Sequence, residues 1–189
     1  IVNDPKMVYG GRQAVLATNF QETGAPLFTN PPGCYMVHQG SFFVDFLSEG
    51  GRKPGESFNF FPFPEIDAKY AGSLEVAGDL FGMFKDTPQA RALIQYLTTP
   101  EAQEIWVKRG GAISPNQKVA PSTYPDPVSQ QLAQTLLNAK SPQFDASDLM
   151  PEAMNAAFWR GVLDFVQNPG NLDQILSRLD QVQTDAYQR

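Results

Sequence analysis

Apolar residues recur at helical spacing through much of the chain, and the clearest of these segments begin with a recognisable start signal. Three of these segments open with a hydroxyl or carboxylate residue followed by proline. Such a side chain can cap the first turn of a helix, and proline fits the first helical position. The three starts are Thr87-Pro88, Thr99-Pro100 and Asp126-Pro127. They predict a series of helices, the second of which ends at the glycine pair 110–111.

Further helices are expected near both ends of the chain. The segment from Tyr9 to Thr23 has a partly apolar face, and Ser41 can cap a short helix rich in phenylalanine. A long helix is predicted over Pro151–Val166, and Asn171 with Gln174 resembles a capping box that opens a final amphipathic helix. The apolar stripe expected on the long helix consists of Met154, Phe158, Val162 and Phe165.

Strand signals are fewer and lie in the first half of the chain. Short strands are expected at Cys34–His38, Phe58–Phe63 and Leu74–Phe84, the last interrupted at Gly78-Asp79, whereas Gly50–Glu56 reads as an exposed loop. Strands spaced by helices indicate an α/β fold. Because the last third is almost entirely helical, the pattern suggests that strand partners come from chain that is not present here.

The composition excludes some classes of function. The chain has 14 Lys and Arg against 20 Asp and Glu, a net charge of −6, and no basic run, so binding to nucleic acid is not expected. Its apolar stretches are too short to span a bilayer. Cys34 is the only cysteine, which excludes an internal disulfide and a cysteine-based zinc cluster. The chain begins at Ile1 without an initiator methionine, which suggests a processed chain or a fragment.

Catalytic constellations are hard to find in the sequence. On a strand, His38 and Cys34 would lie about 13 Å apart, at about 3.3 Å per residue, so they cannot form a local dyad. Cys34 is interpreted as a buried structural thiol. Asp148 is expected to cap the helix that begins near Pro151, because the carboxylates around it lack the spacing of a calcium loop. No metal site or cofactor is predicted, but the sequence does not exclude a pair of glycosidase carboxylates.

Large aromatic residues are the more informative feature. A sugar ring presents an apolar C–H face and a rim of hydroxyls, so its site needs flat aromatic surfaces and a few fixed polar groups. Phe42 follows the predicted strand-to-helix switch at 39–41, where ligands bind in open α/β sheets. Trp159 is expected at the edge of the apolar stripe on the Pro151–Val166 helix. These positions permit a carbohydrate site.

Several motifs, in order over nearly the whole chain, resemble the later half of the extracellular sugar-binding proteins of ABC transporters, and most closely the branch associated with alpha-glucosides. The matching runs are Pro32-Gly33-Cys34-Tyr35-Met36-Val37-His38-Gln39-Gly40-Ser41-Phe42, Phe60-Phe61-Pro62-Phe63-Pro64, Ala77-Gly78-Asp79, Gly110-Gly111-Ala112-Ile113-Ser114-Pro115-Asn116 and Phe144-Asp145-Ala146-Ser147-Asp148-Leu149-Met150-Pro151, leading into Ala157-Phe158-Trp159.

The resemblance implies a periplasmic-binding-protein-like architecture of two α/β lobes, with sugar held between them. This chain would cover mainly the C-terminal lobe plus a helical piece of the N-terminal lobe. Residues 1–77 and 116–189 would belong to the second lobe and residues 78–115 to the first.

The resemblance also implies the ligand-binding residues. Phe42 and Trp159 occupy the positions of stacking aromatics in maltose-binding members of the family, although Phe42 stands where those members have tryptophan. Gly78 and Asp79 would lie beside the cleft. Gln39 and Ser41 complete the expected set of ligand-binding residues.

The function implied is that of a carbohydrate-binding subunit, not an enzyme, that delivers sugar to a membrane permease from a periplasmic or extracellular location. Family members are roughly twice as long, so the chain corresponds to a fragment that could self-associate to supply missing strands. Two alternatives remain open, namely a carbohydrate-active enzyme and a binder of a non-sugar solute on the same architecture.

Overall fold

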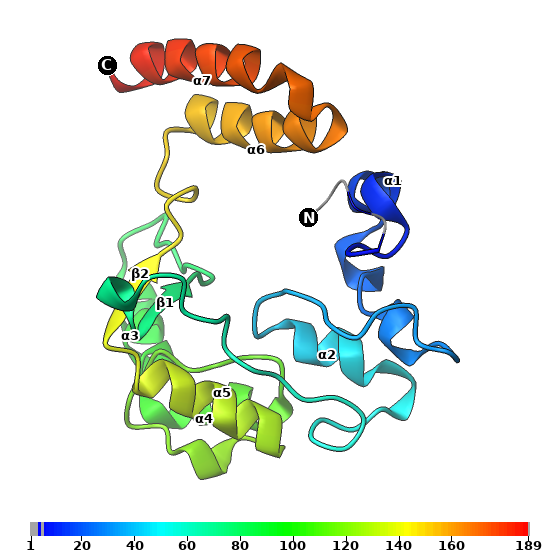
Figure 1. Cartoon of the computed structure of the whole chain (residues 1–189). Coiled ribbons are helices and arrows are strands. Elements are labelled where there is room, and N and C mark those ends of the chain that lie inside the picture. The colour runs from blue at the N-terminus through cyan, green and yellow to red at the C-terminus, as the bar shows by residue number, and fades with distance from the viewer. Residues whose placement is uncertain (1–3, 5, 189) are drawn as a thin grey trace. The chain divides into compact units, whose positions relative to one another are not determined.

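The computed structural model describes residue 4 and residues 6–188, so Ile1 and the other terminal positions (2, 3, 5 and 189) lie outside the described residues. Within that part of the chain, helices outnumber strands (Figure 1). The α-helices are α1 (Gly11–Ala17), α2 (Phe43–Ser48), α3 (Pro88–Leu97), α4 (Pro100–Arg109), α5 (Pro127–Leu137), α6 (Glu152–Gln167) and α7 (Leu172–Tyr187). The two strands are β1 (Ser73–Val76) and β2 (Ser141–Phe144).

The chain divides into two compact units. Unit 1 consists of Ile1–Val37 together with Phe144–Arg189, and unit 2 consists of His38–Gln143. Unit 1 is therefore discontinuous in sequence, and unit 2 is inserted into it. The lobe boundaries expected from the resemblance remain a prediction.

Unit 1 is built around the α6–α7 pair, whose helices lie side by side with opposite directions (Figure 1). The pair meets at Gly161, where an added β-carbon would lie 3.3 Å from both Ile175 and Leu179. Met154, Val166 and Ile175 are its buried apolar residues. Helix α1 packs on α6, and the Arg12 guanidinium donates a hydrogen bond of 2.9 Å to the Gln167 carbonyl.

Unit 2 has its core between α4, α5 and the segment that joins them. The core consists of Val107, Val119, Tyr124 and Ala133, with Ile113 packed against it. The backbone N–H of Ser114 donates to the Tyr124 hydroxyl at 2.9 Å, and this bond satisfies a polar group inside the core.

The three proline-assisted helix starts are confirmed. Thr87, Thr99 and Asp126 each accept a hydrogen bond from a backbone N–H in the first turn of α3, α4 and α5 respectively. Helix α4 ends before Gly110, as predicted from the glycine pair. The long helix is also confirmed, because α6 differs from its predicted span by one residue at each end.

Two predicted strands are wrong, and the third is shorter than predicted. Cys34–His38 and Phe58–Phe63 form no strand, and only Ser73–Val76 of the Leu74–Phe84 region pairs with another strand. β1 and β2 form a two-stranded parallel sheet, so β2 is a strand that the sequence pattern did not reveal. An extended apolar segment becomes a strand only where a neighbour supplies a ladder of hydrogen-bonding partners. Phe58 forms an isolated bridge with Pro54, and among the described residues neither segment forms a ladder.

Several local helix predictions also need correction. The helix predicted over Tyr9–Thr23 stops at Ala17, and a separate 3-10 turn follows. Ser41 does not cap α2, because Phe42 holds the cap position without a side-chain hydrogen bond. Asn171 likewise makes no capping hydrogen bond at the start of α7. Pro151, rather than Asp148, is the cap residue of α6.

The apolar stripe of α6 differs from the predicted one. Met154 is buried and Phe158 is half-buried, but Val162 and Phe165 are exposed. Gly161 and Val166 face the interior instead, because the small glycine lets α7 approach closely. Among the described residues, no helix combines the length and apolar character needed to cross a bilayer.

Candidate functional site

Phe42 lies at the start of α2, next to Gln39 and Ser41. A β-carbon added to Gly40 would come within 2.8 Å of the Phe42 ring, so the ring lies over the Gly40 backbone. Gln39 folds back and accepts a hydrogen bond of 3.2 Å from the Gly40 N–H. Phe42 is 48% exposed, and Ser41 is exposed as well. Unit 2 therefore carries a half-exposed aromatic ring with two polar side chains near it in sequence.

Gly78 and Asp79 follow β1 in an extended segment of unit 2. Both are exposed, and the space around Gly78 is open. The Asp79 carboxylate makes no hydrogen bond or ion pair with the described residues. The segment can therefore present an acceptor to a ligand, but it is not held in place by a side-chain network.

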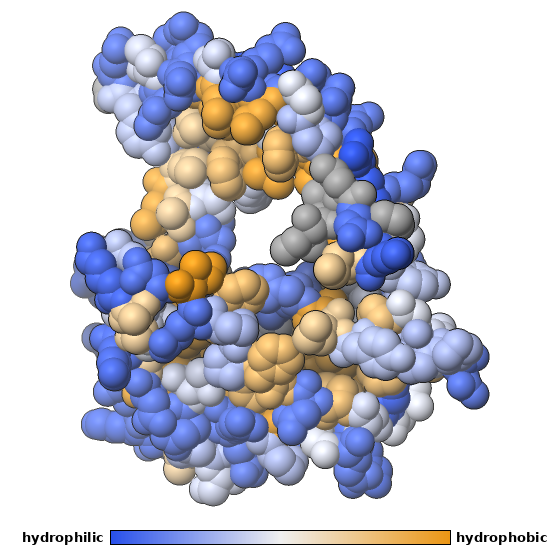
Figure 2. Space-filling model, in the orientation of Figure 1, coloured by the Kyte–Doolittle hydropathy of each residue, from blue (hydrophilic) through white to orange (hydrophobic). Residues whose placement is uncertain are grey.

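Trp159 lies in α6 and belongs to unit 1, whereas the other candidates belong to unit 2. It is 56% exposed, and Val162 and Leu163 are exposed on the same helix. Figure 2 shows apolar surface along the α6 side of the α6–α7 pair. Both candidate rings are partly open to solvent.

Unit 2 contains a hollow of about 520 Å³ that does not follow from the sequence pattern. It is lined by residues of α2, α3 and α4 and by the glycine pair that follows α4. Tyr96 and Trp106 supply aromatic rings that are each 50% exposed. Asp45 and Arg109 supply a carboxylate and a guanidinium to the same hollow. The glycine pair was visible in the sequence, but Asp45 is far from it along the chain, and no periodicity links the two.

The glycine pair shapes one wall of this hollow. Gly111 has φ +74°, and a β-carbon on it would overlap the Asp45 carboxylate. Behind this wall, the Ser114 hydroxyl donates to Gln103 at 3.0 Å, and the Asn116 side chain donates to the Thr98 carbonyl at 2.8 Å. These bonds tie the segment after α4 to the α3–α4 junction and hold the wall in place.

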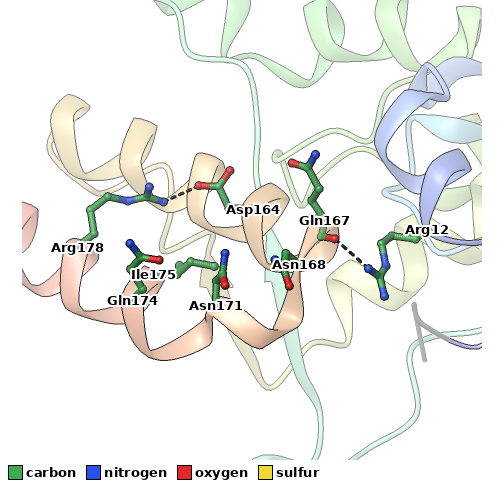
Figure 3. A pocket seen from close by; sticks show the side chains of 8 residues that line it. All are labelled: Arg12, Asp164, Gln167, Asn168, Asn171, Gln174, Ile175 and Arg178. Carbon is green, nitrogen blue, oxygen red and sulfur yellow. Dashed lines mark hydrogen bonds and ion pairs between the residues drawn. The ribbon is translucent and has the colours of Figure 1, made fainter.

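A second hollow, of about 610 Å³, lies in unit 1 between α1, the end of α6 and the start of α7 (Figure 3). Its walls are almost entirely polar. Arg178 donates to Asp164 at 2.6 Å across the α6–α7 pair, in an ion pair that is partly exposed. Arg12 reaches the carbonyl of Gln167, as described above. Because these groups bond to one another, their clearest role is to join three helices.

The residues that the sequence offered for catalysis and metal binding do not form a common site among the described residues. His38 is exposed, and its ring lies 5.2 Å from that of Phe63 in a tilted arrangement. Cys34 is a free thiol and only half-buried, so the interpretation of a buried thiol is wrong. Within the described part of the chain, no three His, Cys, Asp or Glu side chains are grouped as metal ligands would be.

Comparison with known proteins finds two similar chains. One is the osmoprotective compounds-binding protein GgtB of Synechocystis sp., which is 38% identical over 167 residues, or 88% of this chain and 39% of the relative. The other is the alpha-glucosides-binding periplasmic protein AglE of Rhizobium meliloti, which is 40% identical over 169 residues, or 88% of this chain and 37% of the relative. No protein-family profile and no solved structure matches the chain.

Proposed function

Because the chain is homologous over most of its length to the C-terminal part of periplasmic solute-binding proteins, we propose that it is the carbohydrate-binding subunit, in whole or in part, of an ABC-type sugar uptake system. The observation that carries the proposal is the identity of 38–40% over 88% of the chain to two proteins named as binding proteins. The chain spans less than two fifths of the length of these relatives. Both names describe binding rather than turnover, which favours capture over catalysis.

The proposed ligand site is formed by aromatic rings from the two units. Phe42 and Trp159 stack on the apolar faces of a sugar, and Gln39, Ser41, Gly78 and Asp79 bind its hydroxyls. Two observations support this assignment: both rings are about half exposed, and the polar residues are exposed as well. An aromatic ring held open to solvent without a ligand costs free energy, and binding a sugar face recovers part of that cost.

The lobe assignment is part of the same proposal. Residues 78–115 belong to a first lobe whose sheet comes from the part that precedes the matched region in the relatives. Support comes from the face of α3 that carries Leu93, an apolar residue that is exposed. In α/β folds such helix faces pack on a sheet, and the sheet in the described residues has two short strands.

The accessible surface also supports a covering polypeptide. The chain exposes 14,095 Å². A compact protein of the same mass exposes about 8,900 Å², and two separate compact bodies of half that mass expose about 10,800 Å² together. The excess exists even when the two units are treated as independent bodies. Self-association of the isolated chain through this surface remains a prediction, which sedimentation velocity tests.

In the proposed mechanism, the lobes close around the sugar and the closed form docks on the membrane permease in the periplasm. Closure has a physical basis, because a ligand that touches both units stabilises the arrangement in which both sets of contacts form. The substrate class proposed is a small glucoside, since one of the relatives is named for alpha-glucosides.

Isothermal titration of the complete protein with maltose, trehalose and sucrose tests the function. We expect saturable heat from at least one sugar. Trp159→Ala should weaken binding by about thirtyfold, the equivalent of roughly 2 kcal/mol for the loss of a central aromatic contact.

Tyr187→Ala provides the matched control, because Tyr187 is also an aromatic residue that is 56% exposed in unit 1 but lies at the end of α7. This variant should bind like the unaltered protein. Absence of heat with all three sugars, or equal effects of the two substitutions, would contradict the proposal.

A further inference from the structure

The hollow between α2, α3 and α4 contains the elements of a second carbohydrate site. Trp106 offers a flat ring that is half exposed, and Tyr96 offers another from the neighbouring helix. The hollow's volume of about 520 Å³ falls within the range of about 300–1,000 Å³ that is usual for small-molecule sites. All the lining residues belong to unit 2, so this site needs no contribution from unit 1.

The polar groups of the hollow are not satisfied by one another. Asp45 and Arg109 line the same hollow, yet among the described residues neither side chain makes a hydrogen bond or an ion pair. A carboxylate offers only acceptors and a guanidinium only donors. A hydroxyl group both donates and accepts, so a ligand with several hydroxyls can bond to both side chains at once.

The position of Asp45 is constrained by the glycine next to it. Since Gly111 has no β-carbon, the Asp45 carboxylate can lie against the backbone at that point. A side chain at 111 would displace the carboxylate from the hollow. The glycine therefore leaves room for this exposed acceptor beside the hollow.

An entirely apolar occupant fits the hollow less well. Covering Asp45 and Arg109 with an apolar surface would remove both charges from water without giving them partners, which is costly. A pyranose instead places C–H groups against the rings and hydroxyls against the charges. We propose that the Asp45–Trp106 hollow binds a pyranose ring at a second site. This proposal extends the proposed function but stands on residues that the first site does not use.

The emission of Trp106 can test this proposal directly. The chain contains two tryptophans, so a Trp159→Phe variant reports on Trp106 alone. We expect maltose to cause a saturable shift in its emission, and sorbitol, which has no ring face, to cause none. Asp45→Asn should raise the apparent Kd for maltose at least tenfold. Glu101→Gln, on an exposed residue of α4 outside the hollow, should leave it unchanged.

A second variant distinguishes binding at the two sites. In Phe42→Ala combined with Trp159→Ala, both rings of the first site are removed and Trp106 is the single tryptophan, so its response to maltose should persist. Loss of the response in this background assigns the sugar to the first site and overturns the second site while leaving the proposed function intact. No saturable response, or equal effects of Asp45→Asn and Glu101→Gln, also overturns it. If the Trp106 emission changes with protein concentration and not with sugar, a second copy of the chain covers the hollow. That result also overturns the second site.

Discussion

At the scale of single residues, Gly111 combines two requirements that only glycine meets. Its φ of +74° lies in the left-handed region, and its β position is occupied by the Asp45 carboxylate. We therefore expect Gly111→Ala to lower the free energy of unfolding by about 2 kcal/mol, mainly from backbone strain and with a smaller part from the overlap, because the exposed Asp45 side chain can shift. Urea denaturation of the variant, followed by circular dichroism, measures this loss.

Gly51 provides the control for this substitution. It has φ +81°, but nothing lies within 4 Å of its β position. Gly51→Ala should therefore cost only the backbone term, about 1 kcal/mol. Adding Asp45→Ala to Gly111→Ala should remove the overlap and bring the loss close to the value for Gly51→Ala. If the double variant is as unstable as Gly111→Ala, the carboxylate is not the cause.

Sequence reasoning at this scale could single out aromatic residues but not the groups near them. Local patterns gave the places of Phe42 and Trp159 in predicted elements, whereas their stacking role was implied by the family resemblance and stays a prediction; both side chains are exposed. The grouping of Asp45 with Trp106 could not be predicted, because it depends on how α2 packs near the end of α4. Cys34 was predicted to be buried from its residue type alone, but in the structure its side chain is only half-buried.

At the scale of secondary structure elements, caps distinguish helices that begin alike in the sequence. The Asp126 carboxylate accepts hydrogen bonds from both the backbone N–H and the hydroxyl of Ser129, at 2.9 and 2.6 Å. Asp126→Ala should therefore destabilise unit 2 by about 1–2 kcal/mol. Asn171→Ala should have almost no effect, because Asn171 makes no capping bond. Thermal unfolding of the two variants compares them, and an equal loss would show that the Asp126 cap is not important.

The same contrast explains which elements the sequence could predict. A cap such as Thr87 with Pro88 acts within one helical turn, so its effect can be read locally. A strand depends on partners elsewhere in the chain. Phe58–Phe63 has a strong strand pattern, but among the described residues it forms an isolated bridge to Pro54 instead of a ladder, and Phe61 and Phe63 are exposed. β2 was missed for the converse reason, since Ser141–Phe144 has a weak pattern but lies beside β1.

At the scale of the whole molecule, the large exposed surface predicts an unusual heat capacity. Unfolding of a compact protein of this length raises the heat capacity by about 2.5 kcal/mol/K. The folded chain already exposes 14,095 Å², so unfolding exposes only about three quarters of the surface that a compact protein of this mass would expose. We expect a total increase of about 1.9 kcal/mol/K in scanning calorimetry of the isolated chain.

Sedimentation velocity at the same concentration provides the control, because association would bury part of this surface. A value of 2.5 kcal/mol/K or more from a monomeric sample would mean that the exposed apolar residues are covered in solution. That result would also remove the support that the surface gives to a covering polypeptide.

The interruption of unit 1 by unit 2 has a consequence for synthesis on the ribosome. Residues of unit 1 on either side of His38–Gln143 complete their packing only after the C-terminal helices emerge. Synthesis proceeds at roughly 5–20 residues per second, so unit 2 can fold for several seconds before α6, the packing partner of α1, has been made. During that interval the Arg12 guanidinium lacks the Gln167 carbonyl, so α1 cannot complete its packing on α6 until Gln167 has been made.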